Sequence, residues 1–236
     1  MFIVDQPCGL GNPEKRTPVS EPTLSEQAYQ RLRDLIVRLE FAPGDVLNED
    51  SLQEQLSIGR TPIREALQRL AREHFVTVIP RRGMFVSGID VSELSLLFET
   101  RTVLEPYAAR LAAARGDQTL WTAMQQALNQ ATASQTADDL MAIDRTCHEL
   151  MWRAAGNRFL TDTLDMLYAQ SDRLWHLYLA DVADMGEAVD EHATILDALQ
   201  TGDGDRASDL VYEHIRVFDA QIRDAVTDRL ASPLAG

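Results

Sequence analysis

Apolar residues recur at helical spacing in the first quarter of the chain, and polar residues occupy the positions between them. The first stripe begins after Thr23, whose spacing to Glu26 is that of a capping box, and it stops at the sequence APGD. A shorter helix is expected after Asn48, which can cap it. The pattern therefore predicts two helices before residue 57.

A third helix is predicted within SIGRTPIREALQRLAREHF, residues 57–75. Thr61 can cap this helix. Pro62 suits its first turn, because a backbone N–H there would have no acceptor within the helix. The expected buried stripe consists of Ile63, Ala66, Leu67 and Leu70.

The next stretch, FVTVIPRRGMFVSG, is rich in β-branched and aromatic residues. It predicts a strand over residues 75–79, a turn over 80–83 and a returning strand over 84–86. Three helices followed by a two-stranded hairpin are typical of a winged helix-turn-helix domain.

From residue 90 onward the periodicity is helical, and short polar turns such as GD, GN and TGDGD interrupt it. We expect six helices in an antiparallel bundle. Their predicted ends are 90–115, a second ending near 133, 137–155, a fourth ending near 181, 187–200 and 206–230. The chain is thus predicted to be mainly α, with a disordered leader at 1–20, a winged helix-turn-helix domain at 21–88 and an all-α antiparallel bundle at 89–232.

Charge divides the chain at the same boundary. The 236 residues carry a net charge of -15, of which residues 1–88 contribute -1 and residues 89–236 contribute -14. Residues 60–88 contain six arginines and two glutamates. A local basic patch can bind phosphates while an acidic body faces away from them, so the acidic total does not exclude a nucleic-acid partner.

Several features point to the cytoplasm. No run of 18 apolar residues exists, so we expect no membrane span, and the first residues do not resemble a secretory signal. Cys8 and Cys147 lie in unrelated contexts, so a disulfide is not expected.

The basic patch has the pattern of a DNA-reading surface. The outward positions of the third helix are expected to face the major groove, where Arg can pair with guanine and Gln with adenine. The alternative is a solvated arginine-rich face. Arg69 and Arg72 are expected to contact the DNA backbone or solvent. The candidate DNA-binding residues are Arg60, Thr61, Arg64 and Gln68 in the helix and Arg81, Arg82 and Gly83 in the hairpin turn.

These residues also carry a resemblance. The segments PGDVLNEDSLQEQL, GRTPIREALQRL and VIPRRGMFV resemble the GntR family of bacterial transcription regulators over about 65 residues. The resemblance implies that Arg60, Thr61 and Arg64 contact operator DNA, with Arg82 and Gly83 at its edge. Two departures concern the second helix and the turn after it. Asp50 stands where some members have a basic residue. Family members usually have a Gly before the third helix and a Ser just ahead of Arg-Thr-Pro, and in this chain Ser57 and Gly59 occupy those two places.

Histidines and a carboxylate form a second candidate site, in the bundle. Asp144 and His148 are one helical turn apart, and His192 and His214 lie on apolar stripes of two further helices; the side on which His176 lies is unclear. Each histidine alone is more often structural than a ligand. Together, three nitrogens and one oxygen from facing helices suit a divalent ion, Zn²⁺ first and Ni²⁺ as the alternative.

The bundle resembles the FCD effector domain of the FadR subfamily, in its metal-bearing branch. The segments are RTVLEPYAARLAA, DRTCHELMWRAAGN and EHATILDALQTGDGDRASDLVYEHI. The resemblance implies that Asp144, His148, His192 and His214 bind the metal and that a small carboxylate or sugar acid binds beside it. Arg101 is the candidate to pair with that carboxylate, and an internal pair with Glu105 is the equal alternative. Asn157 is expected to cap a helix.

These patterns predict a transcriptional regulator, a repressor by our interpretation, that binds palindromic operator DNA as a homodimer and responds to an anionic metabolite. Two other classes were considered. A metal-dependent hydrolase would need an inward general base beside the ion, which the sequence does not offer, and it would leave the winged helix without a role. A metal sensor, in which the ion itself is the effector, is the other alternative.

Overall fold

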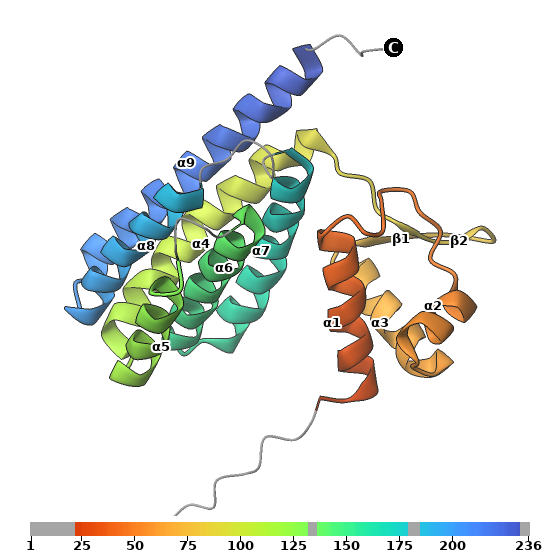
Figure 1. Cartoon of the computed structure of the whole chain (residues 1–236), viewed down its shortest axis with the longest axis horizontal. Coiled ribbons are helices and arrows are strands. Elements are labelled where there is room, and N and C mark those ends of the chain that lie inside the picture. Colours follow the sequence, from red (N-terminus) through yellow and green to blue (C-terminus); the bar gives the residue numbers. More distant parts are fainter. Residues whose placement is uncertain (1–21, 132–135, 179–184, 232–236) are drawn as a thin grey trace, which may run out of the picture.

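The computed structural model describes residues 22–131, 136–178 and 185–231, and within them an N-terminal domain and a helical bundle stand side by side (Figure 1). The predicted leader at 1–20 and the predicted helix ends near 133 and 181 lie outside the described residues. None of the described helices combines the length and the apolar character that a membrane span requires.

The N-terminal domain is a winged helix-turn-helix, as predicted. Its strands pair antiparallel, with Val76 opposite Val86 and Ile79 opposite Gly83, and the hairpin points away from the bundle (Figure 1). Gly83 has a φ of 113°, a conformation that side-chain-bearing residues avoid, so this glycine makes the tight turn possible. The elements are α1 (Leu24–Val37), α2 (Glu49–Leu56), α3 (Arg60–Arg72), β1 (Val76–Ile79) and β2 (Gly83–Val86).

Two of the predicted helix caps are confirmed. The Thr23 hydroxyl accepts a hydrogen bond from the Glu26 N–H at 3.2 Å, and the Asn48 side chain caps α2. The expectation for α3 was wrong, because its N-cap is Gly59, without a side-chain cap, and Thr61 is already the second helical residue. The Gly59 carbonyl already accepts a helical hydrogen bond from the Ile63 N–H at 3.3 Å, so α3 begins at Arg60, one residue before Thr61.

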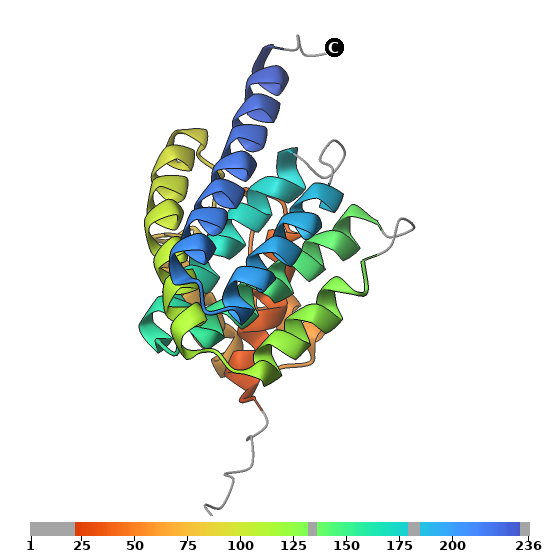
Figure 2. The same ribbon diagram turned by 90° about the vertical axis from the view of Figure 1, so that its left-hand side faces the viewer.

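The described residues of the bundle form the six expected helices. The 3₁₀ turn η1 (Val91–Glu93) precedes them, so the first helix begins at Leu94 and not at residue 90. Helix α6 packs against α4, α5, α7 and α8, and α4 packs along α9, which extends past its neighbours at its C-terminal end (Figure 2). The helices are α4 (Leu94–Arg115), α5 (Gln118–Leu128), α6 (Ala137–Ala154), α7 (Arg158–Tyr178), α8 (Met185–Gln200) and α9 (Gly204–Ala231).

Helix α7 joins the two domains. The buried Arg33 of α1 donates hydrogen bonds to the carboxylate and the backbone carbonyl of Asp165, both at 2.6 Å. Ala169 packs into the apolar core of the winged-helix domain. Gln170 and Arg173 donate hydrogen bonds to backbone carbonyls of the same domain. A shift of α7 would therefore displace these contacts and change the position of the winged-helix domain.

Candidate metal centre and DNA-binding surface

The structure brings the four predicted metal ligands together. Asp144 and His148 come from α6, His192 from α8 and His214 from α9, and one ligand atom from each lies within 4.8 Å of the others. All four side chains are buried. The apolar stripes that carry them pack against each other, and this packing turns the polar side chains toward one point. Within the described residues, this is the group of side chains that could hold a metal ion.

The distances in the cluster are those of groups that share one site. Nε2 of His148 lies 3.3 Å from Nε2 of His214. The nearest Asp144 oxygens are 3.8 Å from Nε2 of His148, 3.6 Å from Nε2 of His214 and 3.4 Å from Nδ1 of His192. Nitrogen and oxygen atoms at this spacing can become common ligands of one ion after small side-chain movements.

Each imidazole also has an oxygen partner at Nδ1. For His148 and His214, whose Nε2 faces Asp144, a partner of this kind fixes the ring orientation and leaves Nε2 for a metal, as in the usual second layer of a histidine metal site. His192 instead has Nδ1 near both the Ala188 carbonyl and Asp144. The pairs are His148 with Glu105 at 2.7 Å, His214 with Glu191 at 2.6 Å and His192 with the Ala188 carbonyl at 2.8 Å. The residues present therefore fit a divalent ion.

Tyr168 of α7 belongs to the site as well. Its hydroxyl donates a hydrogen bond to Oδ2 of Asp144 at 2.6 Å and thereby orients the carboxylate. Tyr168 and Glu191 were not among the residues predicted from the sequence, where Glu105 was expected only as a partner of Arg101. Their helical positions gave no signal, because an inward tyrosine is usual in a core and a contact between helices cannot be read from spacing within one helix.

The electrostatics of the cluster favour a cation. Burial opposes ionisation of Asp144, but the neighbouring imidazoles outweigh it and hold the pKa of this carboxyl well below its usual range. Burial lowers the pKa of His192 to about 3. Burial would also lower the pKa of His214, yet Asp144 and Glu191 outweigh it and raise that pKa to about 9. A metal ion that binds Nε2 of His214 must therefore displace a proton.

The structure has the internal pair that was one of the two alternatives for Arg101. Its Nε donates a hydrogen bond to Glu105 at 2.6 Å, and both side chains are buried. The other oxygen of Glu105 is the one beside His148, so the carboxylate links the arginine to the cluster. Burial raises the pKa of Glu105, but Arg101 and His148 outweigh it and lower the pKa to about 2.

The cavity beside the cluster is small. Its volume is about 10 Å³, and its walls include Arg101, Tyr168 and Phe218. A volume of ~10–15 Å³ holds about one water molecule. In this conformation the site has room for an ion or a water, and a metabolite would have to move side chains aside.

Two remaining expectations concern α7. His176 lies away from the cluster, with Nε2 3.3 Å from the Asp172 carboxylate. Asn157 accepts a hydrogen bond from the Leu160 N–H at 3.4 Å, as expected of a residue that caps a helix start.

The candidate DNA-binding side chains are exposed, as a reading surface requires. Arg60, Thr61, Arg64 and Gln68 are exposed along α3, and Arg81, Arg82 and Gly83 are exposed at the hairpin turn. Both groups belong to the winged-helix domain and are far from the metal ligands in the sequence. Helix α7 contacts this domain through Asp165 and the metal cluster through Tyr168.

Two of these arginines have acidic neighbours from the first turn of α2. Arg60 forms an ion pair with Asp50, and Arg64 lies 3.7 Å from Glu49. Both arginines are more than half exposed, and ion pairs of this kind contribute little to stability. The pairs can therefore be exchanged for phosphate or base contacts.

Arg69 has a structural role that the sequence analysis did not foresee. Its guanidinium lies 3.5 Å from the centre of the Tyr29 ring and pairs with Glu26 at 2.8 Å and Glu73 at 3.0 Å. The Arg69 side chain is 40% exposed, so it keeps the solvent contact that was one of its two expected roles, and its pairs with α1 add a structural role. Arg72 is exposed.

Comparison with known families decides the assignment. Residues 24–86 match the model of bacterial regulatory proteins of the gntR family, and residues 96–217 match the FCD domain. The chain belongs to the GntR family. It is accordingly a DNA-binding transcription regulator with an FCD domain, and not an enzyme.

Relatives of this GntR-family chain match it over most of their length. The HTH-type transcriptional repressor RspR of Escherichia coli is 28% identical over 85% of this chain and 89% of its own. The Nta operon transcriptional regulator of Aminobacter aminovorans is 30% identical over 82% and 94%. The structure of Escherichia coli McbR/YncC shares the fold, with a TM-score of 0.76 and 21% identity over 86% of this chain and 98% of that one.

Proposed function

We propose that this chain is a repressor that binds a palindromic operator as a homodimer and whose operator affinity is set by a small carboxylate or sugar acid bound beside a divalent metal. The observation that carries the proposal is the combination in one chain of an exposed arginine row on α3 and a buried Asp/His₃ cluster in the bundle. Helix α7 contacts the cluster through Tyr168 and the winged-helix domain through Asp165, which accepts a hydrogen bond from Arg33 of α1.

In this proposal α3 lies in the major groove. Arg60, Thr61, Arg64 and Gln68 supply the base and phosphate contacts there, and Arg81 and Arg82 of the wing lie along the neighbouring backbone or minor groove. Gly83 lets the hairpin turn approach the DNA closely.

The metal is proposed to be Zn²⁺, with Ni²⁺ as the alternative. Asp144, His148, His192 and His214 would hold it, because three imidazole nitrogens and one carboxylate oxygen suit borderline divalent ions. When bound, such an ion supplies a positive centre that attracts an anionic ligand. The chain's own contribution is to orient the ligands, through Glu105, Glu191, the Ala188 carbonyl and Tyr168.

Tyr168→Phe tests this orienting role. The substitution removes the hydroxyl that donates to Asp144 and leaves the ring in place. Removing a partner of a metal ligand typically costs about 10- to 100-fold in metal affinity, and we expect a loss in that range. A competition titration with a chromogenic chelator measures it, and an affinity equal to that of the wild type would contradict the role.

The effector arm of the proposal concerns Arg101. A carboxylate that pairs with Arg101 must compete with Glu105, and the cavity of about 10 Å³ must enlarge to admit it. The test is to purify the protein without chelator and to identify the bound metal and co-purified small molecules by mass spectrometry. Operator affinity is then measured with and without the identified acid; an affinity that does not change would overturn this arm.

The small cavity favours a second candidate, a metal sensor in which the ion is the signal. A water-sized space beside the cluster suffices for an ion and its water. Operator affinity that follows free Zn²⁺ with no organic ligand present would establish this candidate. Operator affinity that is indifferent to Zn²⁺ would exclude it.

The proposed homodimer has a candidate surface on α4. Leu96, Val103 and Tyr107 lie on one side of this helix and are 62%, 67% and 53% exposed. Val103 and Tyr107 follow Leu96 by 7 and 11 positions, a spacing that places all three on one face of a helix. They form an apolar stripe that a second copy of the chain could cover.

Val103→Glu tests the dimer surface. A carboxylate buried in an apolar interface without a partner is strongly unfavourable, so we expect the dimer to dissociate at concentrations where the wild type is dimeric. Tyr212→Glu, at an exposed position on α9, is the control. Analytical ultracentrifugation measures the mass, and a Val103→Glu dimer as tight as the wild type would refute the assignment of this surface.

A further inference from the structure

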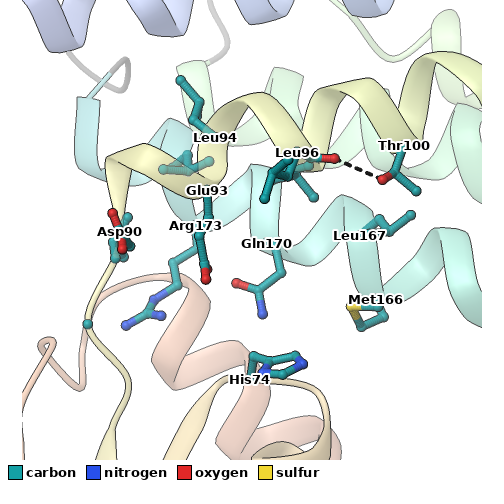
Figure 3. A pocket seen from close by; sticks show the side chains of 14 residues that line it. His74, Asp90, Glu93, Leu94, Leu96, Thr100, Met166, Leu167, Gln170 and Arg173 are labelled. Atoms are coloured by element: carbon teal, nitrogen blue, oxygen red, sulfur yellow. Dashed lines mark hydrogen bonds between the residues drawn. The ribbon is translucent and has the colours of Figure 1, made fainter.

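A cavity of about 270 Å³ lies at the junction of the two domains, outside the metal cluster. Its walls come from four parts of the chain: the turn after α3, the linker into α4, the start of α4, and α7. Figure 3 shows Arg173 and Gln170 extending from α7 toward the winged-helix domain, where His74 lies on the other side. The space is far larger than the cavity of about 10 Å³ beside the metal cluster.

Arg173 is the unusual feature of this cavity. Its side chain is 1% exposed, and its Nη2 donates a hydrogen bond to the Ser87 carbonyl at 2.6 Å. Its Nε is buried without a hydrogen-bond partner. In the described part of the chain, no carboxylate lies within 4 Å of this guanidinium, although such a buried charge is normally paired. Burial without a compensating carboxylate lowers the pKa of Arg173 to about 10.

The other walls indicate what kind of anion would fit. Leu94, Leu97, Leu167 and Leu174 give the cavity an apolar lining. Asp90 and Glu93 are also in the wall, and both are exposed. Two carboxylates near the mouth disfavour ligands with two or more negative charges, so a single negative charge at Arg173 and an apolar body against the leucines match the lining best.

The cavity is distinct from the metal site because the two lie on opposite sides of α7. Tyr168 and Ser171 line the small cavity beside the cluster. Gln170, Arg173 and Leu174 line the junction cavity. At about 100° per residue, the positions of the second set point away from Tyr168.

We propose that the junction cavity is a binding site for a small monocarboxylate with an apolar body, whose carboxylate pairs with Arg173. Arg can offer two parallel N–H groups to a carboxylate, and the charged hydrogen bonds are strong in a buried setting. The apolar body lies against the leucines of α4 and α7.

A ligand in this cavity also touches both domains. Gln170 donates to the Glu73 carbonyl at 2.9 Å and Arg173 to the Ser87 carbonyl, so the residues that line the site also hold the winged helix in place. A ligand that binds one domain arrangement better than another shifts the balance between them. This consequence rests on the proposed repressor function, whereas the binding itself does not.

The test uses the full-length, metal-loaded protein and isothermal titration with hexanoate, with hexanamide as the neutral probe of the same shape. We expect hexanoate to bind and Arg173→Met to weaken its binding by at least about tenfold, since the variant removes charged hydrogen bonds to the carboxylate. Arg158→Met, at an exposed arginine of the same helix, should bind as the wild type does. Hexanamide should bind more weakly than hexanoate, and equal binding would overturn the role of charge.

A further variant and a competition experiment keep the result interpretable. Met166→Trp fills the cavity without touching the guanidinium and should also abolish hexanoate binding. Chelator competition with and without hexanoate then locates the ligand, and the Zn²⁺ affinity of the wild type should be the same in both. If hexanoate changes the Zn²⁺ affinity while Arg173→Met and Met166→Trp still bind hexanoate, hexanoate binds at the metal and the proposal is wrong; absence of binding to the wild type overturns it too. An operator titration with hexanoate, made separately, tests the link to DNA.

Discussion

His148→Ala is expected to eliminate tight Zn²⁺ binding. This residue is 1% exposed and contributes one of four converging ligand atoms, with its ring held by Glu105. Structural zinc sites contribute about 10–16 kcal/mol, or roughly 3 kcal/mol for each of four ligands, so the loss should be on the order of a hundredfold or more. Chelator competition measures the affinity.

The controls for this result separate ligation from packing. His148→Gln keeps most of the side-chain volume between Trp152 and Tyr168 and should lose metal as well, with less effect on folding. His176→Ala removes a histidine of α7 that lies outside the cluster and should bind Zn²⁺ as the wild type does. If His176→Ala loses metal as severely as His148→Ala, the assigned ligand set is wrong.

Arg64→Ala is expected to abolish specific operator binding while the fold stays intact. Arg64 is 63% exposed, so its removal leaves no cavity, and its pair with Glu49 at 3.7 Å is weak. A bidentate base contact contributes about 1–3 kcal/mol to operator binding. A dimer makes the contact twice, so the variant should lose roughly 30-fold or more in operator affinity. Fluorescence anisotropy with labelled operator gives the affinity.

The matched control is Arg216→Ala, an arginine of α9 that is 57% exposed and pairs only with Glu213 among the described residues. It carries the same loss of charge at a position remote from α3 and should bind operator normally. Circular dichroism of both variants should equal that of the wild type. Normal operator binding by Arg64→Ala would contradict the assignment of α3 as the helix that reads the operator.

Much of the architecture could be predicted because it depends on local spacing. Stripes such as Ile63, Leu67 and Leu70 at helical period, and caps such as Thr23 and Asn48, depend on residues three or four positions apart. The cap of α3 was misplaced because the helical hydrogen bonding already begins at the Gly59 carbonyl, so Gly59 and not Thr61 holds the cap position.

The site was predictable in its first layer and not in its second. Asp144 and His148 share a helix face, and His192 and His214 sit on apolar stripes, so their convergence followed from the bundle. Glu191 and Tyr168 act across helix boundaries, and only tertiary packing brings them to the cluster.

The same limit applied to two arginines. Arg69 packs on Tyr29 and pairs with Glu26, and this contact between α3 and α1 cannot be read from spacing within one helix. The unpaired Arg173 could not be recognised from sequence, because an arginine in a helix is normally exposed and its burial depends on the winged helix that covers it.

Selection from genomic DNA tests most directly whether α3 reads an operator. Full-length protein is incubated with sheared genomic fragments at ~150 mM salt, and the bound fragments are sequenced, in parallel with Arg60→Ala/Arg64→Ala protein. We predict that the wild type enriches fragments sharing a palindromic site and that the double variant does not. Enrichment of the same site by both proteins, or of no shared site by the wild type, would contradict the account.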